Sequence, residues 1–109
     1  MTSTRAAATS FVRSDDATSR ITEWRFAPGA ATGWHRHEHD YVVVPLVTGK
    51  LGLDEPGGVV REASLTRGVP YHRGAGVEHD VINVNDFEFA FVEIELKDDG
   101  HRSPGPEGV

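Results

Sequence analysis

Cysteine is absent from the 109-residue chain, and basic residues are outnumbered by acidic ones. Without cysteine there is no disulfide, no thiolate nucleophile and no cysteine-built zinc or iron–sulfur site, so a metal site must use histidine, carboxylate or tyrosine ligands. Eleven Lys and Arg stand against 17 Asp and Glu, which gives a formal net charge of −6. The basic residues are scattered along the chain, which argues against the basic surface of a nucleic-acid-binding protein.

Long hydrophobic runs are missing as well. The longest mainly apolar run, Tyr41 to Val47, is far too short to span a membrane. Residues 1–10 lack the apolar segment of a signal peptide. We therefore expect a cytoplasmic protein with no nucleic-acid and no membrane partner, and its length predicts one globular domain.

Short runs rich in Val, Ile, Phe, Tyr and Thr fill residues 21–97, separated by Gly and Pro turn signals. No window shows the 3.6-residue period of a helix, so these runs predict strands in an all-β barrel. The expected strands are Ile21–Ala27, Trp34–His37, Tyr41–Val47, Lys50–Asp54, Val59–Ala63, Val69–Arg73, His79–Val84 and Phe87–Leu96. We expect residues 1–20 to form an N-terminal arm and residues 98–109 a flexible C-terminal tail.

The last expected strand is apolar on both faces for part of its length, which implies a second layer or a partner subunit. Phe89 and Phe91 are assigned to the inner wall of a small pocket together with Val81. Glu93 and Glu95 are interpreted as part of a solvent-facing surface. Trp34, beside the first histidines, is assigned to the core or to a dimer interface.

Five of the six histidines lie between positions 35 and 79. Residues two apart in a strand point to the same side, so His35 and His37 would present their imidazoles to one cation at about 2.0–2.1 Å per bond. Such a pair is also common on protein surfaces, so it does not by itself establish a metal site. His39 has the same parity but lies past the expected strand end, which favours a role outside the ligand set.

The surroundings of these histidines resemble the two sequence motifs of the cupin family. The first motif, G-x5-H-x-H-x(3,4)-E-x6-G, is matched by Gly29, His35, His37 and Gly49, with no Glu at the expected place. The second, G-x5-P-x-G-x2-H-x3-N, is matched by Gly68, Gly76, His79 and Asn83, with Gly74 in place of Pro. The stretches GWHRHEHDYVVVPL and GVEHDVINVNDFEFAFVEIELK also resemble small stand-alone cupins, some of which carry a β-alanine degradation label that names no reaction.

This resemblance implies an antiparallel β-barrel of the jelly-roll type, forming a homodimer, with one divalent metal ion at its mouth. Carried over residue by residue, it makes His35, His37 and His79 the metal ligands. Iron, manganese, nickel, zinc and copper all remain open, because imidazole ligands alone discriminate poorly among them.

The position of the family's carboxylate ligand is ambiguous in this chain. One spacing places it at Val42 and the other at Tyr41, and neither is a carboxylate. Tyr41 shares the parity of His37 and is placed near the metal, where it or Asp40 would transfer a proton. For Asp40, a role as a turn residue is favoured over metal ligation.

Two functions follow from this site. The first is an enzyme, of dioxygenase, isomerase or lyase type, acting on a small metabolite at a three-histidine metal centre. The second is a non-catalytic module or sensor that binds a small molecule in the same cavity. The missing Glu weakens the oxygenase hypothesis, and a metal-free scaffold is a third possibility.

Overall fold

The computed structural model describes residues 5–97, and the predicted tail at residues 98–109 lies outside them. The described chain is all-β, as predicted, and its named strands pair only in antiparallel fashion. Its strands are β1 (Thr9–Asp15), β2 (Ser19–Phe26), β3 (His35–Arg36), β4 (Tyr41–Pro45), β5 (Gly49–Glu55), β6 (Val59–Leu65), β7 (Tyr71–Arg73), β8 (Glu78–Asn83) and β9 (Phe89–Leu96), with a short 3-10 turn at Pro56–Gly58.

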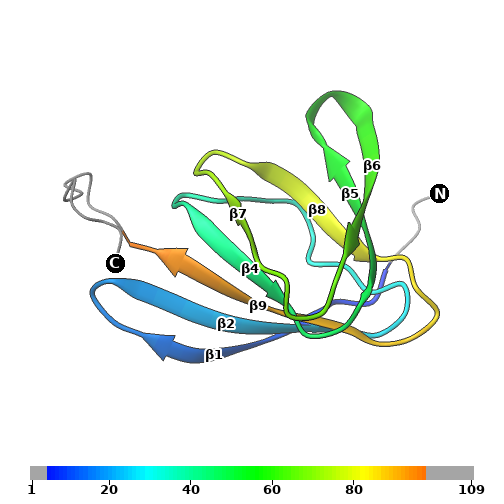
Figure 1. The fold of residues 1–109 in the computed structure, drawn as a ribbon. Coiled ribbons are helices and arrows are strands. Elements are labelled where there is room, and N and C mark those ends of the chain that lie inside the picture. Colours follow the sequence, from blue (N-terminus) through cyan, green and yellow to red (C-terminus); the bar gives the residue numbers. More distant parts are fainter. Residues whose placement is uncertain (1–4, 98–109) are drawn as a thin grey trace.

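The strands form two sheets that face one another (Figure 1). One sheet has the order β1-β2-β9-β4-β7, and the other has the order β3-β8-β5-β6. Both sheets contribute to one core, which contains Phe26 and Phe89 from the first sheet and Leu51 and Val81 from the second. The fold is therefore the predicted jelly-roll barrel.

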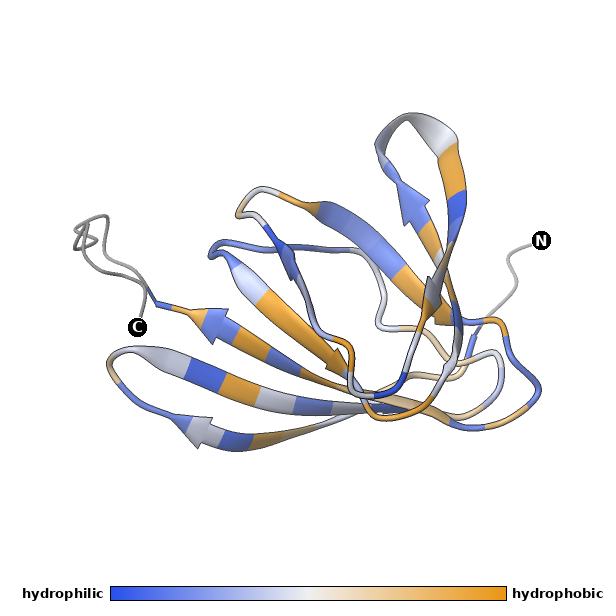
Figure 2. Ribbon diagram, in the orientation of Figure 1, coloured by the Kyte–Doolittle hydropathy of each residue, from blue (hydrophilic) through white to orange (hydrophobic). Residues whose placement is uncertain are grey.

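Strand β9 lies in the middle of the larger sheet, between β2 and β4. Its first residues, Phe89 and Phe91, are buried in the core. Figure 2 shows that the opposite half of β9 alternates between hydrophobic and hydrophilic bands. The barrel interior therefore changes from apolar at one end to polar at the other along the same strand.

The larger sheet includes a strand that precedes residues 21–97, the range predicted for the barrel. Thr9–Asp15 forms strand β1 and pairs with β2, with an irregularity between Val12 and Ser14. All seven residues of β1 are exposed, so the segment belongs to the sheet but contributes no buried side chain to the core. Backbone pairing requires no apolar side chains, so the hydrophobic pattern gave no sign of this strand.

Two exposed aromatic side chains complete the description. Trp34 is 55% exposed, so its assignment to the core was wrong, and a place in a dimer interface stays a prediction. Phe87 is also exposed.

Within residues 5–97, no helix has the length and apolar character needed to cross a membrane.

Candidate metal centre

Backbone pairing between β3 and β8 brings the two cupin-like motifs together. His35 lies directly opposite His79 in this antiparallel pair. The pairing continues past the end of β3, where His37 N–H donates to Val77 O at 2.8 Å and Gly76 N–H donates to His37 O at 2.8 Å. Main-chain hydrogen bonds therefore hold the three histidines together, although His37 and His79 are 42 residues apart in the sequence.

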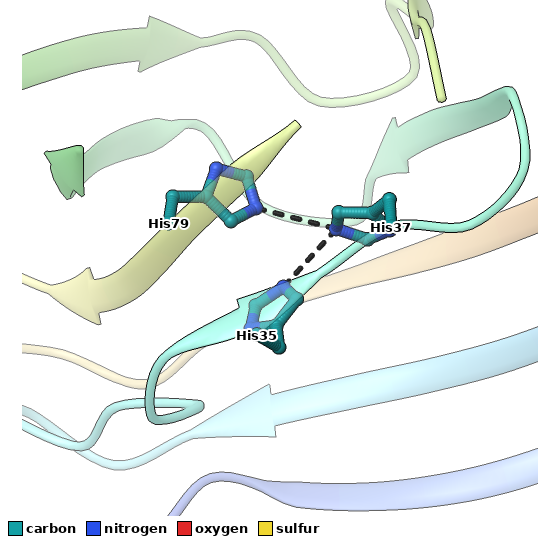
Figure 3. A group of neighbouring side chains, drawn as sticks. All are labelled: His35, His37 and His79. Atoms are coloured by element: carbon teal, nitrogen blue, oxygen red, sulfur yellow. Dashed lines mark hydrogen bonds between the residues drawn. The ribbon is translucent and has the colours of Figure 1, made fainter. Parts of the chain in front are cut away.

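The three imidazoles point toward one another (Figure 3). The Nε2 atoms of His35 and His37 are 3.0 Å apart, and those of His37 and His79 are 3.3 Å apart. Two nitrogens bound to one ion at about 2.1 Å are separated by about 3.0–3.4 Å, depending on the coordination angle. The donor set and its spacing thus fit a small divalent cation.

The lowered pKa values of His37 and His79 also suit metal binding, which requires neutral imidazole. Burial, reinforced by the neighbouring His35, lowers the pKa of His37 to about 3 and the pKa of His79 to about 4. His35 Nδ1 lies 2.9 Å from Gly33 O. A proton on Nδ1 that is donated to this carbonyl leaves the Nε2 lone pair facing the cluster.

Tyr41 lies against the cluster. Its ring stacks on His37 with the ring centroids 3.8 Å apart, and the residue is 2% exposed. The hydroxyl is buried and has no hydrogen-bond partner among the described residues. Burial raises the pKa of Tyr41, so the neutral phenol is favoured over a phenolate ligand.

Asp40 is not part of the group formed by the three histidines. Its carboxylate accepts the Ala75 N–H at 2.8 Å, and its main-chain carbonyl accepts the Leu96 N–H at 2.9 Å. The residue is not among those that line the pocket. The structure therefore places Asp40 as a turn residue that supports the loop before β8, and it does not bring this carboxylate to the metal centre.

A pocket of about 270 Å³ adjoins the three histidines. Phe91 and Val81 line it as expected, but Phe89 is completely buried in the core instead. The volume is at the small end of the range for ligand sites, about 300–1,000 Å³, and fits a metabolite of a few carbons. The polar part of the wall includes Trp24, Tyr41, Tyr71, Arg73, Glu93 and Glu95.

The prediction that Glu93 and Glu95 face solvent was wrong, because both line the pocket. They have the parity of Phe89 and Phe91, which point into the barrel, and this parity was the signal that could have identified them. Burial is the main cause that raises the pKa of Glu93 to about 7, and the charge of Glu95 raises it further. The charge of Arg20 has a smaller, opposing effect. Glu93 is thus a carboxyl group that can gain or lose a proton near neutral pH.

Arg73 is one of two arginines that line the pocket, and Arg36 is the other. Arg73 lies opposite Tyr41 in the β4–β7 pair, and its charge contributes to the lowered pKa of His37 and of His79. Within the described part of the chain, its guanidinium makes no ion pair, in contrast to Arg36, which lies 3.7 Å from Glu78. Arg73 is therefore available to a bound anion.

Comparison with known proteins agrees with this geometry, although no family model matches the chain. The chain is 58% identical over 86 residues to the β-alanine degradation protein BauB of Pseudomonas aeruginosa, covering 79% of this chain and 90% of that protein. The crystal structure of a cupin domain from Bordetella pertussis is 54% identical, with a TM-score of 0.85, and covers 89% of this chain and 100% of that one. A double-stranded β-helix domain from Klebsiella pneumoniae, 19% identical with a TM-score of 0.71, shares the fold over 92% of this chain and 85% of its own. The chain belongs to the cupin family.

Proposed function

We propose that His35, His37 and His79 bind one divalent metal ion and that the protein is an enzyme acting on a small carboxylate in the adjoining pocket. The observation that carries this proposal is the convergence of three Nε2 atoms, 3.0 and 3.3 Å apart in successive pairs, at the pocket wall. Iron, manganese, nickel, zinc and copper are all compatible with three imidazoles.

A divalent ion at this position supplies Lewis-acid or redox chemistry of the kind used by dioxygenases, isomerases and lyases. The surrounding residues have separate tasks. Tyr41 covers one face of His37 and keeps water from it, and Glu93 exchanges a proton with the substrate near neutral pH. Asp40, which holds the loop at Ala75, is a positioning residue in this proposal.

The size and charge of the pocket support a small carboxylate as the substrate. Among residues 5–97, Arg73 lines the pocket without an ion pair of its own, and a guanidinium binds a carboxylate through paired hydrogen bonds. The relative BauB is named for the degradation of β-alanine, which is itself a carboxylate of three carbons. The name is consistent with the volume and the charge of this pocket.

A non-catalytic binding protein is the second candidate. One observation favours it: among residues 5–97, the group that could hold a metal contains three histidines and no carboxylate. Val42, at one of the two positions where the cupin motif has Glu, has an apolar side chain. In this alternative the same pocket retains a small molecule without converting it.

Elemental analysis of the purified protein tests the metal site. We expect about one equivalent of a divalent metal in the wild type and little in the His35→Ala/His79→Ala double variant, because two of three ligands are removed. His72→Ala is the matched control, since His72 is exposed on β7 and outside the cluster. A wild type that stays metal-free after incubation with each of the five ions would refute the proposal.

Product analysis then separates the two functions. The metal-loaded protein is incubated with a panel of small carboxylates, and the mixture is analysed by mass spectrometry. Conversion by the wild type that is lost in His79→Ala supports the enzyme. Ligand-dependent thermal stabilisation with no product supports the binding protein.

A further inference from the structure

Two rows of paired residues cross the larger sheet at the pocket, and their members on β9, β4 and β7 line it. They run across four neighbouring strands, β2, β9, β4 and β7, and residues paired across such strands point to the same face. The row nearer the mouth is Arg20, Glu95, Tyr41 and Arg73. The deeper row is Thr22, Glu93, Val43 and Tyr71.

Glu93 is the acidic member of the deeper row. Its neighbours on both sides, Thr22 and Val43, are buried, and Phe91, two residues before it on β9, belongs to the core. In the described part of the chain, the Glu93 carboxyl group has no hydrogen bond and no ion pair. A carboxyl group in such a place costs free energy unless something hydrogen-bonds to it.

Other polar groups of the same pocket also lack partners. The indole N–H of Trp24 and the hydroxyl of Tyr41 are buried and unbonded among the described residues, and both residues line the pocket. Buried polar groups in proteins normally have partners. Several unpartnered groups around one cavity therefore point to a polar ligand that completes them.

Arg73 and Glu93 stand at different places on this wall. They lie on strands β7 and β9, with β4 between them, and adjacent strands are about 4.8 Å apart. Both side chains are long and reach into the same cavity of about 270 Å³. A ligand of a few carbons can therefore place one end at the guanidinium and the other at the carboxyl group.

We propose that Glu93 determines specificity: the pocket takes a small carboxylate that also carries a hydrogen-bond donor, an ammonium or hydroxyl group, with its carboxylate at Arg73 and its donor at Glu93. This inference rests on the proposed function, because it concerns the same pocket. A ligand with an apolar end leaves Glu93 unpaired after water is expelled, and sites with buried polar groups reject such ligands strongly. A carboxyl group with a pKa of about 7 is sufficiently ionised near neutral pH to accept a hydrogen bond from the ligand.

Isothermal titration calorimetry with three acids of the same length tests the proposal. The probes are propionate, 3-hydroxypropionate and β-alanine, titrated at pH 7.5 into the zinc-loaded protein. We expect the wild type to bind at least one of the two donor-bearing acids about tenfold or more tightly than propionate. Glu93→Leu removes the acceptor and should bring all three affinities within about threefold of one another.

Glu93→Gln tells the two donors apart, because it keeps an acceptor oxygen but removes the charge. If Glu93→Gln loses the preference for β-alanine alone, the recognised donor is the ammonium group. If Glu93→Gln loses neither preference, the recognised donor is the hydroxyl group. Glu62→Gln is the control, since Glu62 is an exposed carboxylate on β6 that does not line the pocket. Its affinities should equal those of the wild type.

The test remains decisive if the metal site fails. Zinc content is measured first, and a protein that takes no zinc refutes the metal-dependent function; the titrations are then run on the metal-free protein, because neither Arg73 nor Glu93 belongs to the histidine cluster. Equal affinity for the three acids, or binding of none of them, overturns the specificity proposal. A preference that survives in Glu93→Leu overturns it as well.

Discussion

The two ends of strand β8 carry buried polar side chains in opposite situations. His79 and Asn83 lie on the same face of the strand and are 4% and 1% exposed. Asn83 Nδ2 donates to the carbonyls of Phe26, Ala27 and Phe87, and its Oδ1 accepts the Asn85 N–H. His79 Nδ1 has no partner among the described residues, and its Nε2 faces His37.

The two ends of β8 therefore differ in what their buried polar side chains contact. At the closed end of the barrel, a polar side chain satisfies main-chain groups from β2 and from the β8–β9 loop, so its hydrogen bonds stabilise the fold. At the open end, His79 Nδ1 and the Tyr41 hydroxyl have no hydrogen-bond partner among the described residues. Such atoms cost stability unless a ligand completes their hydrogen bonds, as the proposed function requires. The same change occurs along β9, from buried Phe89 to pocket-lining Glu93.

The largest expected effect comes from removing the satisfied side chain. Asn83→Ala leaves buried carbonyls and an N–H without partners, so we expect the free energy of unfolding to fall by about 3–4 kcal/mol. Urea denaturation measures this loss. The metal content of the folded variant should equal that of the wild type. If Asn83→Ala is as stable as the wild type, the proposed difference between the two ends of β8 is wrong.

The opposite result is expected at His79. His79→Ala should weaken metal affinity at least about 100-fold, because a ligand is lost. The metal-free protein should change in stability by less than about 1 kcal/mol, since the lost imidazole left a buried nitrogen unbonded. Competition with a coloured chelator measures the affinity, and urea denaturation in EDTA measures the stability. A drop in stability as large as that of Asn83→Ala would contradict the contrast.

Much of this picture could be predicted from the sequence, because it depends on spacing. The positions of His35, His37 and His79 in two motifs predicted the cluster that the structure brings together. The expected strand Tyr41–Val47 contains the observed β4, Tyr41–Pro45. Local alternation and turn residues were sufficient here, because β4 is short, ends at Pro45 and is followed by Gly49.

The missed features depend on contacts that are distant in the sequence. Glu93 lies next to Ile94 in a pattern typical of a solvent face, and its burial arises because β4 and β7 continue the sheet beside β9 and because the second sheet faces them. Asp40 looked suitable for proton transfer, but its carboxylate is bonded to Ala75, 35 residues away. Neither arrangement leaves a local periodic signal.

Titration of Glu93 should give a smaller effect that depends on pH. Burial raises the pKa of Glu93 from 4.5 to about 7, so the folded protein binds more protons than the unfolded chain between these values. The wild type should therefore lose stability relative to Glu93→Gln as pH rises through this window, by about 2 kcal/mol in total, and the difference should level off above pH 7. Urea denaturation of the metal-free proteins at pH 5, 6, 7 and 8 measures it.

The comparison between variants isolates Glu93 from its surroundings. The charged and titratable groups that share its wall are Arg20, Tyr41, Tyr71, Arg73 and Glu95. His37 and His79, whose pKa values are lowered, act in the opposite sense at acidic pH, but they are present in both proteins. Stability curves of wild type and Glu93→Gln that run parallel from pH 5 to 8 would show that the carboxyl group is not buried.

The smallest expected effect tests the comparison at the edge of the sheet. Val12 on β1 is 51% exposed, and Val43 on β4 is 3% exposed. Val12→Thr should change the free energy of unfolding by no more than about 0.5 kcal/mol, whereas Val43→Thr, which buries a hydroxyl, should cost about 2 kcal/mol. If Val12→Thr costs as much as Val43→Thr, β1 packs against something outside the chain. Dependence of that cost on protein concentration would then identify the second surface as another copy, because a dimer contact is lost on dilution.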